Sequence, residues 1–351
     1  TFTIGFNEAG YNEAWHAKAV AKHLGTEHTE LYISPQDAMD IIARLPSLYD
    51  EPFSDSSQIP TFLVSEMTRQ HVTVSLSGDG GDELFGGYNR YVKTQQWWEK
   101  IRRIPTPLRH FLSHSLSVPS PAAWNRMGKA FAYISGNNER WLNLGNRLSK
   151  LAGVLAVSKD YDLYRHFVTH WSDPASIVVN GIEPPTEITR PQLHLNETME
   201  QMMALDSVSY LPDDILCKVD RAAMGVSLET RVPMLDHRVI EFAWRLPLNM
   251  KIRDGEGKWL LRQVLYKHVP KELIERPKMG FGVPIDSWLR GPLRDWAESL
   301  LCESRLRQEG FFNPAPIRQK WEEHLSGKRN WQYHLWDVLM FQAWLEQEQS
   351  H

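Results

Sequence analysis

The chain has 351 residues, of which 42% are hydrophobic and 23% charged, a balance typical of globular proteins and unlike disordered chains. Its net charge of −4 and its dispersed Lys and Arg argue against nucleic-acid binding. Two cysteines are too few for a disulfide framework, and no apolar run approaches the roughly 18 residues of a membrane span. We therefore expect a globular cytoplasmic chain of two or three domains, with no membrane partner.

The first 95 residues alternate strand-like and helix-like segments. We predict strands at 2–6, 29–33 and 72–77, and helices at 12–24, 34–48 (with Ser34 as its cap) and 59–70. Strands separated by helices predict a parallel sheet in an α/β layer. Ligands bind such sheets at the carboxyl ends of strands, which here means after Phe6 and after Ser77.

From about residue 92 onward, apolar residues recur at helical spacing and the strand signal fades. We expect an α/β part at 1–95, a helical insertion at 96–205 and a second, mainly helical part at 206–351. The sequence opens inside an apolar stretch at Thr1, so we expect a piece of a longer chain. A catalytic N-terminal threonine is the alternative interpretation of Thr1.

The sharpest feature is the glycine-rich acidic segment 77–88, which directly follows a predicted strand. Its glycines allow the backbone to turn tightly and approach a ligand. If the segment is helical, Asp79, Asp82 and Glu83 share one face, where their mutual repulsion calls for a cation or a donor. Mg²⁺ bound with a nucleotide phosphate fits this need. A calcium-binding or plain turn loop is the alternative.

A second charged segment spans 211–222. On a helix, Asp214, Lys218 and Arg221 fall on one face, which suits either a polar site or an ordinary salt-bridged surface. Spacing alone does not separate these two interpretations. Charges among apolar residues in the following segment, 229–236, favour pairing or function.

Three weaker signals complete the set. Lys258 lies at the start of a predicted helix, after a glycine-rich stretch, and a lysine at this position can bind phosphate groups. The basic loop 276–284 is either an anion lid or a surface turn. The polar loop 53–58 either binds a small polar substrate or simply caps the next helix, and its place near the ligand edge of the sheet favours a substrate role.

Four segments together resemble the glutamine-dependent asparagine synthetases. Residues 77–88 resemble the family's SG-[E/D]-G-x-DE-x-x-x-GY segment, and 212–236 resemble PDD-x-L-x-KVDR…LE-x-R-x-P-x-LD. Lys258 with 261–262 resembles K-x-x-LR, and 276–284 resembles RPK-x-GFG-x-P. The order and spacing agree from about residue 2 to 345. The resemblance implies a truncated parallel sheet of the adenine-nucleotide α-hydrolase-like (PP-loop ATPase) type with a large, mainly helical remainder.

The same resemblance implies roles for individual residues toward ATP and Mg²⁺. Asp82 matches a magnesium ligand, Lys258 the lysine that stabilises pyrophosphate, and Asp79 a position proposed to deprotonate the incoming nitrogen. Asp79 is one methylene shorter than the Glu found in many members. The remaining matches are Ile4 on adenine, Ser77 and Gly78 on AMP, and a polar network of Glu83, Lys218, Asp220 and Arg221.

The family's pyrophosphate-binding SGG-x-DS loop and its glutaminase domain have no counterpart in these 351 residues. We therefore expect that this chain alone does not hydrolyse glutamine and that its ATP chemistry is impaired. The implied activity is amidation of a carboxylate through an acyl-AMP, with aspartate and ammonia as substrates, and a homodimer is a further possibility. The alternatives are amidation of another carboxylate, such as a sugar acid, and a non-catalytic remnant that acts as a binding module. Residues 50–60 contain no Arg, which a substrate α-carboxylate would favour.

Overall fold

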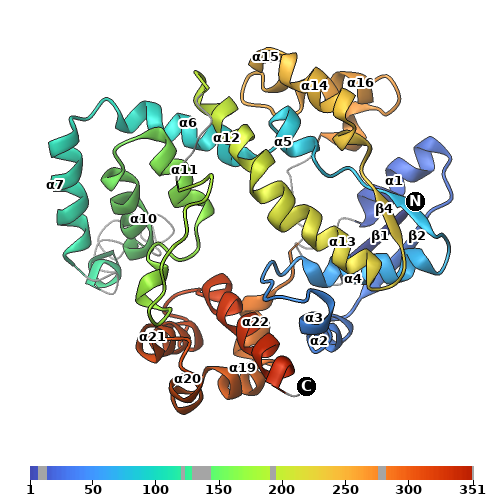
Figure 1. Ribbon diagram of the computed structural model, residues 1–351. Helices are drawn as coiled ribbons and strands as arrows, with labels where there is room; N and C mark the ends of the chain where they lie inside the picture. The colour runs from blue at the N-terminus through green and yellow to red at the C-terminus, as the bar shows by residue number, and fades with distance from the viewer. Residues whose placement is uncertain (7–13, 120–122, 129–143, 190–194, 276–281, 350–351) are drawn as a thin grey trace. The chain divides into compact units, whose positions relative to one another are not determined.

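The computed structural model describes most of the chain and divides it into two compact units (Figure 1). Unit 1 comprises residues 1–87, 173–185 and 206–351, and unit 2 comprises 88–172 and 186–205. The described residues are 1–6, 14–119, 123–128, 144–189, 195–275 and 282–349. Most of them are helical, and the strands are few and short.

Unit 1 contains two pairs of parallel strands. Strand β1 (Phe2–Phe6) pairs with β2 (Thr29–Ile33) in the register Phe2 to Thr29, and β3 (Val74–Leu76) pairs with β4 (Glu229–Arg231). A parallel partner requires a crossover connection, and helix α1 (Ala14–Leu24) lies between β1 and β2 and packs on β1. The expectation of parallel pairing is confirmed, but among the described residues β3 pairs with β4 and not with β1 or β2, so the three predicted strands do not form one sheet. That the sheet belongs to the PP-loop type stays a prediction.

Helix α4 (Gln58–Arg69) packs on β1, and helix α13 (Cys217–Met224) packs on both α4 and β4 (Figure 1). Most of α4 is buried, and Ile59 and Phe62 are completely so. Ile4 of β1 and Ala222 of α13 are buried as well. These apolar contacts fix α13 relative to the strands, which positions the charged side chains of α13.

One predicted helix differs from the structure, and one short strand was not predicted. The helix expected at 34–48 is two helices, α2 (Pro35–Ile42) and α3 (Leu45–Leu48). Pro46 lacks an N–H group and its ring clashes with a preceding turn, so the helix is interrupted before it. Strand β4 lies in the half expected to be mainly helical. It was not predicted because three residues that pair only with the distant strand β3 carry no local strand pattern.

The rest of unit 1 is helical, and its carboxyl-terminal helices bury Trp321 and Trp336. The remaining helices of unit 1 are α5 (Gly81–Phe85), η1 (Pro174–Ser176), the π-helical turn η2 (Leu211–Leu216), η3 (Pro233–Leu235), α14 (His237–Arg245), α15 (Leu248–Lys251), α16 (Trp259–Leu265), α17 (Lys271–Ile274), α18 (Ile285–Arg290), α19 (Arg294–Leu301), α20 (Glu303–Glu309), α21 (Pro314–Leu325) and α22 (Gln332–Gln349).

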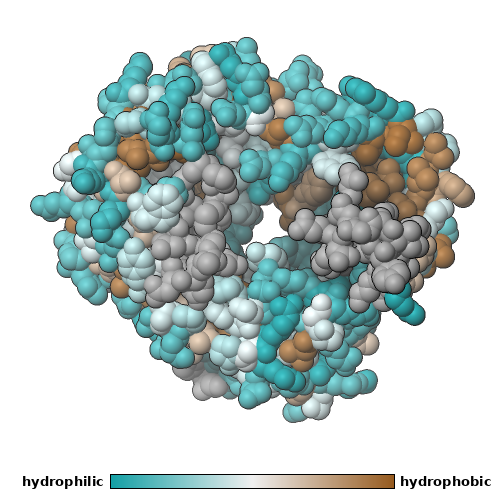
Figure 2. Space-filling model, turned by 180° about the vertical axis from the view of Figure 1, so that it is seen from behind, coloured by the Kyte–Doolittle hydropathy of each residue, from teal (hydrophilic) through white to brown (hydrophobic). Residues whose placement is uncertain are grey.

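The described residues of unit 2 form helices and loops and contain no strand. Its helices include α6 (Asn89–Ile101), α7 (Thr106–Ser117), α10 (Leu144–Ala156), α11 (Asp160–Val168) and the larger part of α12 (Thr198–Val208). Ile101, Leu155 and Leu163 are buried members of its core. Phe111 and Val118, at and just beyond α7, are exposed, and Figure 2 shows hydrophobic surface along this helix. Among the described residues, no helix is long and apolar enough to cross a membrane.

Candidate active site

The acidic glycine segment forms a tight turn followed by a short helix. The Ser77 N–H donates to the Arg231 carbonyl (2.9 Å), which ties the end of β3 to β4. Gly80 takes a left-handed conformation (φ 78°), and a Cβ there would lie 2.4 Å from a Leu235 methyl group. Glycine is favoured here because a side chain at this position would strain the left-handed backbone and displace the Leu235 side chain. The turn starts helix α5 at Gly81.

Helix α5 is held by apolar contacts on one face. Leu84 and Phe85 are buried with Ala243 of α14, and α5 packs beside α14 and α16 (Figure 1). Five residues cannot form a stable helix alone, so this packing maintains it. Glu83 is also buried, at 1% exposure, whereas Asp82 is part-exposed.

The segment around Lys258 contacts helix α5 directly. Lys258 has a left-handed backbone (φ 56°), and its N–H donates to the Phe85 carbonyl (2.8 Å). A Cβ on Gly257 would lie 2.1 Å from the Gly86 carbonyl oxygen, so only glycine allows this approach. Lys258 Nζ lies 2.9 Å from Asp82 Oδ2. Two motifs far apart in the sequence therefore form one ion pair.

The three predicted carboxylates do not share a helix face. Asp79 precedes the cap of α5, and its Oδ2 accepts a hydrogen bond from Ser77 Oγ (2.6 Å). Glu83 is enclosed in the core, and Asp82 pairs with Lys258. The expectation of a shared face was wrong because the positive-φ turn at Gly80 separates Asp79 from the helix. The described residues contain no cluster of three His, Cys, Asp or Glu side chains that could bind a metal ion.

The second motif forms ion pairs with a distant segment. Lys218 Nζ donates to Asp55 Oδ2 and lies 3.5 Å from Asp214 Oδ1. Arg221 Nη1 donates to Asp50 Oδ2 (2.7 Å), and Asp220 is exposed. The sequence had placed Asp214, Lys218 and Arg221 on one face but had not identified Asp50 and Asp55 as their partners. The only signal was the polar character of the loop at 53–58.

Burial makes the Lys218 cluster electrostatically unusual. Burial, followed by the charge of Asp55, raises the pKa of Asp214 to about 7, against the opposing effect of Lys218. Burial alone would raise the pKa of Asp55 too, but the charge and hydrogen bond of Lys218 hold it below its usual value. Asp55 also accepts hydrogen bonds from the N–H (2.9 Å) and hydroxyl (2.7 Å) of Ser57. The environment of the cluster therefore favours the ionised form of Asp55 and the protonated form of Asp214.

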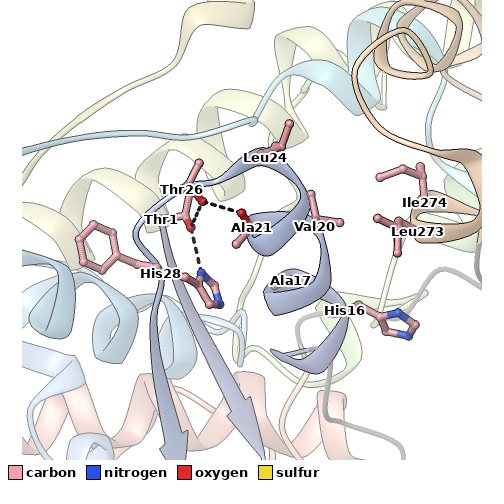
Figure 3. A pocket seen from close by; sticks show the side chains of 11 residues that line it. Thr1, His16, Ala17, Val20, Ala21, Leu24, Thr26, His28, Leu273 and Ile274 are labelled. Carbon is pink, nitrogen blue, oxygen red and sulfur yellow. Dashed lines mark hydrogen bonds between the residues drawn. The ribbon is translucent and has the colours of Figure 1, made fainter.

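Two other regions complete the description. The predicted basic loop falls mostly on 276–281, outside the described residues. A cavity of about 360 Å³ opens beside β1, α1 and α17, and Figure 3 shows Thr1 next to His28 at its wall. Thr1 Oγ1 lies 2.9 Å from His28 Nδ1. None of the residues that line this cavity belongs to the four sequence motifs.

Known proteins resemble this chain over most of its length. The sequence profile of the asparagine synthase family matches residues 1–346. The chain belongs to the asparagine synthase family. It is 30% identical to asparagine synthetase (glutamine-hydrolyzing) 1 of Bacillus subtilis (strain 168), across 98% of this chain and 51% of that protein. It is 26% identical to asparagine synthetase (glutamine-hydrolyzing) 3 of the same organism, across 72% of this chain and 33% of that protein.

Part of the chain is also similar to a vertebrate protein. The asparagine synthetase (glutamine-hydrolyzing) of Gallus gallus is 30% identical across 46% of this chain and 32% of that protein. The resemblance drawn from the four motifs is thus confirmed. The chain spans about half the length of the curated relatives that it matches over nearly its whole length.

Proposed function

We propose that this chain supplies the synthetase residues for the amidation of a carboxylate through an acyl-AMP intermediate, with aspartate, ATP and ammonia as substrates and asparagine as product. The observation that carries the proposal is the Asp82–Lys258 ion pair, which forms beyond the carboxyl end of β3 in a member of the asparagine synthase family. A carboxylate is a poor electrophile, and adenylation gives it a good leaving group. The negative charge that develops on the phosphates requires positive charge at this site.

The chain's own residues supply the groups for these steps. Lys258 Nζ is positioned to stabilise departing pyrophosphate, because the left-handed conformation and the hydrogen bond to Phe85 hold the Lys258 backbone in place. The backbone around Ser77 and Gly78 approaches AMP, and Ile4 packs on adenine. Asp79, oriented by Ser77, accepts the proton of the attacking nitrogen.

The polar surroundings have supporting roles in this proposal. Lys218 and Arg221 are held by their carboxylate partners, Asp220 offers an exposed carboxylate, and buried Glu83 orders the core of α5. None of these four needs to touch the reacting atoms for the chemistry above. They complete the network that the family resemblance assigns to the site.

Asp82 is the residue that would hold Mg²⁺. The donor set fits, because Mg²⁺ takes one or two carboxylates and draws its other ligands from water and substrate phosphates, so no larger protein cluster is needed. Asp82 retains an exposed edge and lies beside Lys258, which faces the same phosphates. When bound, Mg²⁺ neutralises phosphate charge.

We place the carboxylate acceptor at residues 50–58, here called the acceptor segment, since the segment is polar and its side chains contact α13. Ammonia is proposed to come from a glutaminase domain, because the relatives are named as glutamine-hydrolyzing. A cytoplasmic location and a homodimer remain further proposals.

A second acceptor class deserves the same test. The acceptor segment contains no Arg, and the cations that contact it are already paired, Lys218 with Asp55 and Arg221 with Asp50. An α-carboxylate therefore finds no open guanidinium on this segment. This observation favours a carboxylate without a second anionic group, such as a sugar acid.

Titration calorimetry of the chain with Mg²⁺-ATP tests the nucleotide site. We expect binding, and a loss of affinity of about tenfold or more, 1.4 kcal/mol, in Asp82→Asn and in Lys258→Met. Asp254→Asn is the matched control, because it makes the same charge change at an exposed nearby position. If the chain binds no nucleotide, or if Asp82→Asn and Lys258→Met bind as tightly as the wild type, the enzyme proposal fails and a binding module remains.

Pyrophosphate release identifies the acceptor. The chain is incubated with Mg²⁺-ATP, ammonia and either aspartate or a uronic acid, and release is compared with the no-acceptor background. Release that depends on aspartate supports the first acceptor, and release that depends only on the uronic acid supports the second. Asp82→Asn should abolish either signal.

A further inference from the structure

Helix α13 forms two ion pairs with the acceptor segment. The outer contact is the exposed pair Arg221–Asp50, and the inner contact is the largely buried pair Lys218–Asp55. Lys218 and Arg221 are three residues apart on one helix face, so a single helix orients both ends of the segment. Asp50 needs such anchoring because its backbone is left-handed (φ 55°). Its carbonyl also accepts a hydrogen bond from Trp344 Nε1 of α22 (3.3 Å).

The inner contact is a three-residue cluster. Asp55 approaches Lys218 from the acceptor segment, and Asp214 approaches it from the π-helical turn η2 (Leu211–Leu216) that precedes α13. Pro212 lies within this turn, where it removes a donor and widens the helix. Such wide turns are frequent at functional sites. The titratable groups that face Asp214 are Lys218, Asp55, Cys217 and Tyr49.

The charges of this cluster balance only with a shared proton. One ammonium against two carboxylates leaves a net charge of −1 in a partly buried site, which is unfavourable. A proton on Asp214 makes the cluster neutral and gives Asp214 an O–H group that can donate to Asp55. Cys217 and Tyr49 stay neutral near pH 7 and add no charge of their own, because burial raises the pKa of both groups.

We propose that Asp214 is a positioning residue whose protonated carboxyl group donates a hydrogen bond to Asp55, so that Asp214, Asp55 and Lys218 together hold the acceptor segment against helix α13. The inference rests on the proposed function only for the role of residues 50–58 as the acceptor segment. The shared proton itself is a property of the folded chain and needs no nucleotide.

The pH dependence of segment opening follows from this arrangement. When residues 50–58 move away, Asp214 returns to an ordinary aspartate pKa near 4. Between that value and about 7, the closed form binds one more proton than the open form. Opening therefore becomes easier by up to tenfold per pH unit as the pH rises to about 7, and it levels off above that.

Hydrogen exchange of the full chain, followed by mass spectrometry from pH 5 to pH 8.5, tests this. Exchange of the amides at 50–58 is divided by their intrinsic rates to give the opening equilibrium. In the wild type we expect opening to increase up to about pH 7. In Asp214→Asn, whose amide donates a hydrogen bond but does not titrate, opening should be independent of pH in this range.

Two further variants make the result decisive. Asp213→Asn removes an exposed carboxylate from the same turn and should behave as the wild type. Asp55→Asn removes the charge next to Asp214, so the pH at which opening levels off should move down. The second variant also serves if Asp214→Asn fails to fold.

The proposal is overturned if the wild type and Asp214→Asn share one pH profile, or if Asp55→Asn leaves the wild-type profile unmoved. Because no nucleotide or acceptor is present, that outcome leaves the proposed function intact. Conversely, absence of Mg²⁺-ATP binding would overturn the proposed function and leave the shared proton standing.

Discussion

At the scale of single residues, His324 illustrates how burial fixes a protonation state. Its Nδ1 accepts the Trp331 N–H (3.1 Å), and its Nε2 lies 3.3 Å from the Asp286 carbonyl oxygen. An acceptor nitrogen on one side and a donor on the other require the neutral ring. Burial, and then the charge of Arg290, lowers the pKa of His324 from 6.5 to about 4.

This lowered pKa predicts acid sensitivity. Between pH 6.5 and about 4, His324 is protonated in the unfolded chain but neutral in the native chain. The free energy of unfolding therefore falls as the pH falls. The loss attributable to His324 is about 3 kcal/mol across this range. Urea unfolding at pH 7 and pH 4.5 should show it in the difference between the wild type and His324→Gln. Exposed His237→Gln is the control, and equal pH slopes in wild type and His324→Gln would contradict the prediction.

Gly257 is a second residue whose identity is dictated by contact. Its substitution by Ala places a methyl group 2.1 Å from the Gly86 carbonyl oxygen, which is backbone and cannot rotate away. We expect a loss of about 2 kcal/mol in the free energy of unfolding, together with weaker Mg²⁺-ATP binding as Lys258 is displaced. Thermal and urea unfolding measure the first effect. Gly78→Ala, where a Cβ meets no atom within 4 Å, should leave stability nearly unchanged.

At the scale of elements, the start of α2 is specified by its own sequence. Ser34 Oγ accepts the Asp37 N–H (3.2 Å), and Asp37 accepts the Ser34 N–H (2.9 Å), which satisfies two otherwise unpaired donors. Pro35 follows at the first helical position, where it loses no hydrogen bond. These hydrogen bonds lower the pKa of Asp37, so the capping acceptor stays ionised.

Removing this cap should be measurable. Ser34→Ala is expected to lower the free energy of unfolding by about 1 kcal/mol, because one helical N–H loses its acceptor. Urea unfolding at pH 7 is the measurement. Ser115→Ala is the matched control, since Ser115 is an exposed residue inside α7 and caps nothing. A Ser34→Ala loss no larger than that of the control would show that the cap contributes little.

At the scale of the whole molecule, unit 1 depends on ion pairs between distant segments. The largely buried Lys218–Asp55 pair and the exposed Arg221–Asp50 pair both connect α13 to residues 50–55. Breaking a buried pair leaves an uncompensated charge, whereas water solvates the partner of a broken surface pair. The two pairs should therefore differ strongly in energy despite their proximity.

A double-mutant cycle tests this difference. Asp55→Asn and Lys218→Met should each cost about 3 kcal/mol, and the double variant should cost about 2 kcal/mol less than their sum. The matching cycle with Asp50→Asn and Arg221→Met should show a coupling energy below about 1 kcal/mol. Urea unfolding of both sets gives the values. Equal coupling in the two cycles would mean that the inner pair is as well solvated as the outer one.

The candidate site was accessible from sequence only in part. Glycines, carboxylates and a lysine at fixed spacing identified Asp82 and Lys258 as candidates and pointed to the family. The spacing wrongly put Asp79 on a helix face with Asp82 and Glu83, because a left-handed turn at Gly80 is not visible in helical periodicity. Asp55 and Asp50 stayed hidden as partners, since nothing local links them to α13.

By itself, the sequence determined what neighbouring residues decide: strands at 2–6 and 29–33, the Ser34 cap, the glycine turn after residue 77 and membership of the family. These features depend on local conformational preference, side-chain period and ordered motifs. Only the tertiary structure decided the pairing of β3 with β4, the Asp82–Lys258 contact and the cluster of Asp55, Asp214 and Lys218. Each of these joins segments separated by long stretches of chain, and packing of the intervening elements, rather than spacing along the sequence, brings them together.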